Sequence, residues 1–131
     1  MNAPNPWFFL LAGYLFTVMI ETPVLLIGLS SRHPFRRRLF AGLWLTACTY
    51  PIVIIVLPAL FAGASRGLYL WVAEIFAPVA ECALFRLAFG ERSERGRASM
   101  WRDFAAIILA NLASFGLGEV MNAYEWFGLL G

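Results

Sequence analysis

The chain has 131 residues, of which 61% are hydrophobic and 14% are charged, and its formal net charge at pH 7 is +2. Soluble domains contain about 25% charged residues, so this composition excludes an ordinary soluble protein and indicates an integral membrane protein. All ten cationic residues are arginines. They lie where membrane topology requires them and have no interleaved aromatic residues, so we expect no nucleic-acid partner.

Four hydrophobic segments are long enough to cross a bilayer. They cover residues 7–29, 39–62, 68–89 and 104–124, and each is near the ~20 residues that a helix needs to cross ~30 Å of hydrocarbon. The first is too long for a cleavable signal and its leader MNAPNP has no positive charge, so we expect it to remain as a helix. The sequence predicts one all-α domain, 1–131, built as a bundle of four transmembrane helices.

The arginines predict the orientation of this bundle. They cluster in the connections between spans one and two and between spans three and four, at Arg32, Arg36, Arg37 and Arg38 and at Arg92, Arg95, Arg97 and Arg102. The positive-inside rule places both connections in the cytoplasm and both termini outside. We expect a bacterial inner membrane, a solvated third connection, and a solvated His33 within the first Arg-rich loop.

Prolines interrupt the first three spans beside polar residues. Pro23, Pro51 and Pro78 each remove an amide donor and clash with the carbonyl four residues earlier, which predicts kinks in helices 1 to 3. Pro23 follows Glu21 by two residues, and Pro78 follows Glu74 by four. The sequence therefore places acids beside interrupted backbone.

The third and fourth spans each carry a polar face. Glu74 and Glu81 are seven residues apart, so they project from one side of a helix, and an ionised acid at the bilayer centre costs at least ~2.5 kcal/mol. In the fourth span, Asn111, Ser114, Gly118 and Asn122 recur at spacings of three and four residues, which is also one helix face. We expect these faces to turn inward as a polar seam.

Estimated depths divide the seam into two levels. The first level contains residues at the bilayer midplane or slightly on its cytoplasmic side. The second level contains two acids that lie nearer the outer surface. The predicted ligand-, ion- or proton-binding residues are Glu21, Glu81, Asn111, Thr49 and Ser114 at the first level and Glu74 and Glu119 at the second.

Clustered intramembrane acids cannot all be ionised without a positive charge beside them. Arg86, at the cytoplasmic end of span three, is the fixed cation we expect nearby. One arginine cannot neutralise several carboxylates, so bound protons or a bound cation must supply the remaining positive charge. No other cofactor and no catalytic residue are predicted, and the sequence leaves a metal undecided. The alternative interpretation is interhelical hydrogen bonding worth ~0.6 to 2 kcal/mol per contact, which asparagine and serine would provide at lower cost.

The run PVAECALFR, residues 78–86, resembles the first motif of the CAAX-protease and bacteriocin-processing family of intramembrane proteases. The resemblance implies a catalytic Glu81 with Arg86 as its partner. Cys82 stands in place of the second glutamate of that motif, and spans three and four contain no histidine. We interpret the match as a coincidence of an acid, an apolar turn and an arginine.

Three functions follow, in order of preference. The first is proton- or cation-coupled transport or ion binding by a homo-oligomer. The second is a non-catalytic subunit or assembly factor of a larger membrane complex. The third, an intramembrane hydrolase, depends on the nine-residue resemblance, and we favour a protein that is not an enzyme.

Overall fold

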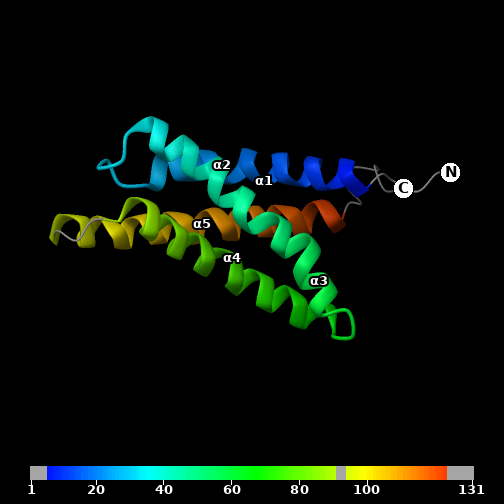
Figure 1. Cartoon of the computed structure of the whole chain (residues 1–131). Helices are drawn as coiled ribbons and strands as arrows, with labels where there is room; N and C mark the ends of the chain where they lie inside the picture. The colour runs from blue at the N-terminus through cyan, green and yellow to red at the C-terminus, as the bar shows by residue number, and fades with distance from the viewer. Residues whose placement is uncertain (1–5, 91–93, 124–131) are drawn as a thin grey trace.

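The computed structural model describes residues 6–90 and 94–123, and this part of the chain is helical without any strand. Helix α1 is Pro6–Gly28, α2 is Phe35–Pro51, α4 is Arg66–Phe89 and α5 is Glu94–Ala123. Helix α2 continues through a π-helical segment, η1 (Ile52–Val56), into the short helix α3 (Leu57–Leu60), as Figure 1 shows.

Four helical stretches are long and apolar enough to cross a membrane: Leu10–Gly28, Phe35–Leu60, Arg66–Phe89 and Ala98–Val120. The predicted fold class is therefore confirmed. Large apolar side chains such as Met19, Ile27 and Leu87 remain 75%, 80% and 84% exposed. Such exposure is expected where hydrocarbon instead of water surrounds the helices.

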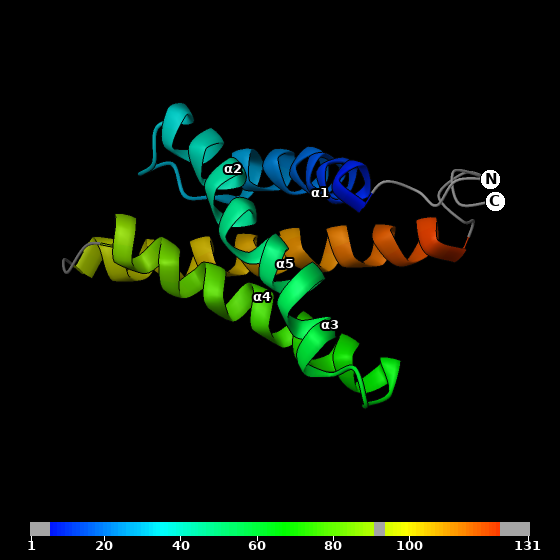
Figure 2. The same ribbon diagram turned by 45° about the vertical axis from the view of Figure 1, so that its right-hand side comes forward.

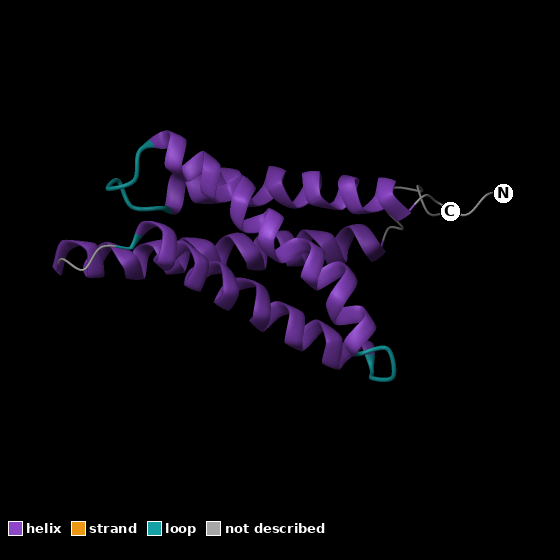
Figure 3. Cartoon of the chain, in the orientation of Figure 1, coloured by secondary structure: helices purple, strands orange, loops and turns teal. Residues whose placement is uncertain are grey.

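The bundle is closed at one end and splayed at the other. Helices α1 and α5 run side by side, whereas α2, α3 and α4 diverge from them toward the α3–α4 connection (Figure 2). The α1–α2 loop lies at the same end as the end of α4 and the start of α5, and the α3–α4 loop lies at the opposite end (Figure 3). Both Arg-rich connections thus belong to one end.

Most of the buried apolar core lies in the closed half, where small residues bring the helices together. Its members come from all four spans: Leu25, Leu29, Ala41, Leu45, Phe85, Ala106, Ile107 and Ala110. Gly42 of α2 meets Thr22 of α1, and Gly28 of α1 meets Ala106 of α5. Close approach at small residues is the usual way in which membrane helices gain van der Waals contact.

The π-helical segment frees a carbonyl for contact between helices. The Leu57 N–H donates to the Ile52 carbonyl, five residues earlier, and Pro58 has no N–H. The Val53 carbonyl loses both usual helical partners for this reason, and the Tyr69 hydroxyl of α4 donates to it at 2.8 Å. An interrupted helix on one span thereby positions an aromatic ring on the next.

The start of α5 and the helices around the prolines differ in how they compare with the sequence-based predictions. Helix α5 begins at Glu94, so residues 94–103, predicted to be a solvated connection, are helical. Helices α1 and α4 continue on both sides of Pro23 and Pro78, and Pro51 ends α2 where η1 begins. A bend at each of these three prolines stays a prediction. Asn122 lies on α5, but its side chain is outside the described residues.

We predict that Gly42→Ala destabilises the bundle, because the added Cβ would collide with the Thr22 side chain. Overpacking of this kind lowers the free energy of unfolding by about 1 to 3 kcal/mol. Gly116→Ala is the matched control, since a Cβ there meets nothing within 4 Å and alanine is favoured over glycine inside a helix. In detergent micelles, the unfolding temperature of Gly42→Ala should therefore lie below that of the wild type, whereas Gly116→Ala should show no decrease. Equal unfolding temperatures for the two variants would contradict the packing described.

Candidate functional site

The Glu21 carboxyl group joins three helices inside the bundle. Glu21, on α1, is 2% exposed. The Thr46 hydroxyl of α2 donates to its Oε2 at 2.8 Å, and the Ser114 hydroxyl of α5 donates to its Oε1 at 2.8 Å. Both carboxyl oxygens thus have a hydroxyl partner, as a buried carboxyl group requires.

Glu81 brings the fourth span to the same place. Glu81, on α4, is 3% exposed, and its carboxyl group lies beside the side chains of Thr49 and Asn111 and near the Glu21 carboxyl group. The Asn111 amide donates one N–H to the Ile107 carbonyl at 2.9 Å, which leaves its second N–H for a carboxyl oxygen. Two acids from different helices therefore share one buried seam.

This seam forms part of the wall of a cavity of about 240 Å³ between the splayed helices. Six of the seven predicted site residues line it: Glu21, Thr49, Asn111, Ser114, Glu74 and Glu119. Glu81 is not in the lining; it is buried behind it, against Thr49 and Asn111. The remaining lining residues are mostly apolar or aromatic and include Phe16, Tyr50, Tyr69 and Phe115.

An ion pair stands where the cavity reaches the surface. Arg66, at the start of α4, lies 3.2 Å from Glu119 Oε1 on α5, and these side chains are 63% and 35% exposed. The sequence predicts Arg86 as the fixed cation near the acids. Arg66 lines this cavity and Arg86 does not, since Arg86 lines a groove on another face of α4 and α5.

Sequence reasoning missed Thr46 and Arg66 as members of this site. Thr46 precedes Thr49 by three residues on α2, so the helix spacing used for the fourth span would have found it. Arg66 falls between the predicted spans 39–62 and 68–89. Its pairing with Glu119 depends on how α4 and α5 approach each other, which the sequence does not show.

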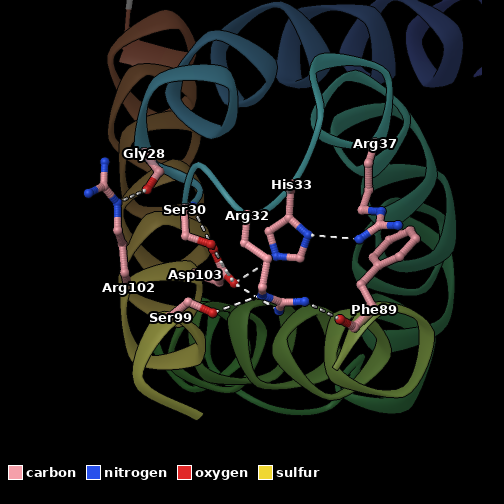
Figure 4. Close-up of polar contacts among 9 residues, drawn as sticks. All are labelled: Gly28, Ser30, Arg32, His33, Arg37, Phe89, Ser99, Arg102 and Asp103. Carbon is pink, nitrogen blue, oxygen red and sulfur yellow. Dashed lines mark hydrogen bonds and ion pairs between the residues drawn. The ribbon is translucent and has the colours of Figure 1, made fainter. Parts of the chain in front are cut away.

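A second polar cluster, unnoticed in the sequence, closes the other end of the bundle. Asp103 of α5 is 0% exposed and accepts a hydrogen bond from the Ser30 amide at 2.7 Å. Its Oδ2 lies 2.9 Å from His33 Nε2 and 3.7 Å from an Arg32 guanidinium nitrogen (Figure 4). The carboxylate thus fastens the α1–α2 loop to α5.

His33 was expected to be solvated, and this prediction is wrong, since the side chain is 0% exposed. Arg37 lies 3.3 Å from His33 Nδ1. A guanidinium can only donate, so Nδ1 accepts and the imidazole proton is on Nε2, which donates to Asp103. Burial lowers the pKa of His33, although Asp103 opposes the shift.

Further arginines tie this end of the bundle to backbone carbonyls. Arg32 donates to the Ser99 hydroxyl at 2.9 Å and to the Phe89 carbonyl at 3.2 Å, and Arg102 donates to the Gly28 carbonyl at 3.0 Å. These contacts are drawn in Figure 4. The arginines that predicted the topology therefore also satisfy carbonyls at helix ends.

Comparison of the chain with protein families, with curated proteins and with solved structures finds no match. Within residues 6–90 and 94–123, no three side chains of His, Cys, Asp or Glu are grouped so that they could hold a metal ion. The geometry of the two clusters is therefore the basis for any functional assignment.

We predict that acid weakens the bundle through His33. Because burial lowers its pKa below the ordinary 6.5, the unfolded chain binds more protons than the folded one just below that pH. The free energy of unfolding therefore falls as the pH drops below about 6.5. Thermal unfolding at pH 7.5 and 5.5 measures the change.

His33→Gln is the comparison for this prediction, because its amide can still donate to Asp103 but does not titrate. Its unfolding temperature should fall less than that of the wild type between the two pH values. An equal or larger fall would show that His33 is not the group responsible.

Proposed function

We propose that this chain is a small transport-type membrane protein in which Glu21 and Glu81 exchange protons for a cation. One observation carries the proposal: the two carboxyl groups share a buried seam at a cavity that reaches the surface at Arg66. Intramembrane ionisable residues that line a cavity are by default candidates for ion or proton pathways.

The electrostatics of the seam support exchange over simple hydrogen bonding. Two neighbouring buried carboxyl groups cannot both be ionised without a positive charge, because desolvation and mutual repulsion both oppose it. The surrounding hydroxyl and amide groups of Thr46, Ser114 and Asn111 carry no charge. A proton and a cation are therefore alternative partners for the same pair of acids.

The backbone around the cavity supports the same function. Helices interrupted near the midplane are a recurring feature of transporter binding sites. Here the π-helical segment Ile52–Val56 interrupts the second span and borders the cavity through Val53 and Ile54. Pro78 also lines the cavity, within the continuous helix α4.

The membrane setting completes the proposal. We place the Arg-rich connections in the cytoplasm and the termini outside a bacterial inner membrane, because the arginine distribution fits the positive-inside rule. Four helices enclose a cavity of about 240 Å³, which is too small for a continuous path across ~30 Å of hydrocarbon and favours a homo-oligomer as the working unit.

Proteoliposomes test this function. With an acidic interior and a pH-sensitive dye enclosed, the addition of external cations should drive proton efflux through the wild-type protein. Glu21→Gln and Glu81→Gln should each slow the efflux at least about tenfold, a change of ~1.4 kcal/mol, because the amide cannot exchange a proton.

Glu94→Gln is the matched control, because it makes the same chemical change at the first residue of α5, outside the apolar stretch Ala98–Val120. It should leave the rate unchanged. Wild-type rates in both seam variants, or the absence of cation-driven proton movement in the wild type, would eliminate the proposal. Purification only as part of a larger complex would support the subunit function instead.

A further inference from the structure

The acids that line the cavity are too far apart to surround one small ion. Glu119 lies five residues beyond Ser114 on α5, so its backbone is about 7.5 Å further along the helix axis than the residue that holds Glu21. Glu74 precedes Glu81 by seven residues on α4, or about 10.5 Å. Ca²⁺ and Mg²⁺ take six or more oxygen ligands at about 2.0 to 2.6 Å, and acids spaced in this way do not converge on one such centre.

Aromatic rings occupy the wall between the acidic levels. Phe16, Tyr50, Tyr69 and Phe115 come from four different helices and all line the cavity. Two of them are fixed in place, since the Tyr69 hydroxyl bonds the Val53 carbonyl and the Tyr50 ring packs against Gly13 of α1. Aromatic faces attract organic cations and are the usual way in which proteins recognise quaternary ammonium groups.

The size of the cavity agrees with a ligand of one ring. An apolar protein cavity of about 150 Å³ already accommodates benzene, and the volume here is about 240 Å³. A benzene-sized body with a substituted ammonium group therefore fits, whereas a bare metal ion would leave most of the volume unfilled.

The chain itself places an organic cation at the mouth of this cavity. Arg66 directs its guanidinium at both oxygens of Glu119, at 3.2 and 3.4 Å, and Tyr69 lies near both side chains. A carboxylate beside an aromatic ring already pairs with a planar organic cation in this position. A ligand of similar chemistry would compete with Arg66 for Glu119.

We propose that the cation exchanged at this site is an organic monocation, a substituted ammonium with an aromatic or branched apolar body, and that Arg66 is its tethered competitor. This inference rests on the proposed function and specifies its substrate class. Binding displaces the Arg66 guanidinium from Glu119 and releases a proton from the buried acids to water, so that charge is conserved.

Isothermal titration of the purified full-length protein with benzyltrimethylammonium chloride tests the substrate class, with tetramethylammonium chloride and sodium chloride as comparisons. The aromatic cation should bind most tightly, and heats measured in buffers of different ionisation enthalpy should show proton release. Titration into empty micelles removes the contribution of partition into detergent.

Variants locate the binding. Tyr69→Leu removes an aromatic face and should weaken binding about three- to thirtyfold, as expected for one cation–π contact. Trp71→Leu, on the same helix but 68% exposed and outside the cavity, should leave affinity unchanged. Glu119→Gln should weaken binding, whereas Arg66→Gln should strengthen it and Arg66→Lys should restore the wild-type value.

The outcomes separate this inference from the proposed function. Exchange of protons for sodium without binding of benzyltrimethylammonium would overturn the organic substrate class and leave the proposed function standing. Binding that is insensitive to Tyr69→Leu, Glu119→Gln and Arg66→Gln would also overturn the inference. Absence of both exchange and binding in a monodisperse wild-type protein would overturn both.

Discussion

Hydrocarbon offers no hydrogen bonds, so each polar group on these four spans must find its partner inside the bundle. The carboxyl group of Glu21 meets this requirement most directly, because Thr46 and Ser114 reach it from two other helices at 2.8 Å each. Glu81 and Asn111 extend the same seam to α4. The rotation of every helix about its axis is constrained by this seam, because its polar face must point inward.

Polar groups are buried at one end of the bundle and partly exposed at the other. At the Arg-rich end, Asp103 brings Ser30, Arg32 and His33 into a largely buried cluster. At the other end the helices separate, and the Arg66–Glu119 pair remains partly exposed at the mouth of the cavity. Glu21 thus lines a cavity whose mouth carries the Arg66–Glu119 pair, at the end away from the Arg-rich loops.

The sequence predicted the number of spans and most of the seam, because both follow from local rules of length and helical spacing. Glu21, Thr49, Asn111 and Ser114 lie together for that reason. The Asp103 cluster could not be predicted, because Ser30 and His33 lie in the loop between α1 and α2, where no helical spacing indicates which side chains turn inward. An Arg-rich loop looks solvated in a sequence, and only the fold shows that it turns back onto α5.

Site-directed labelling most directly tests the claim that this acidic seam opens to one side of the membrane. In a background without Cys48 and Cys82, Ser114→Cys would place a thiol at the cavity wall, and Ala110→Cys would place one in the buried core one turn earlier. A small charged, membrane-impermeant thiol reagent should modify Ser114→Cys from the side of the α3–α4 loop and leave Ala110→Cys unmodified. Protection of Ser114→Cys from both sides, or modification from the side of the Arg-rich loops, would contradict the account.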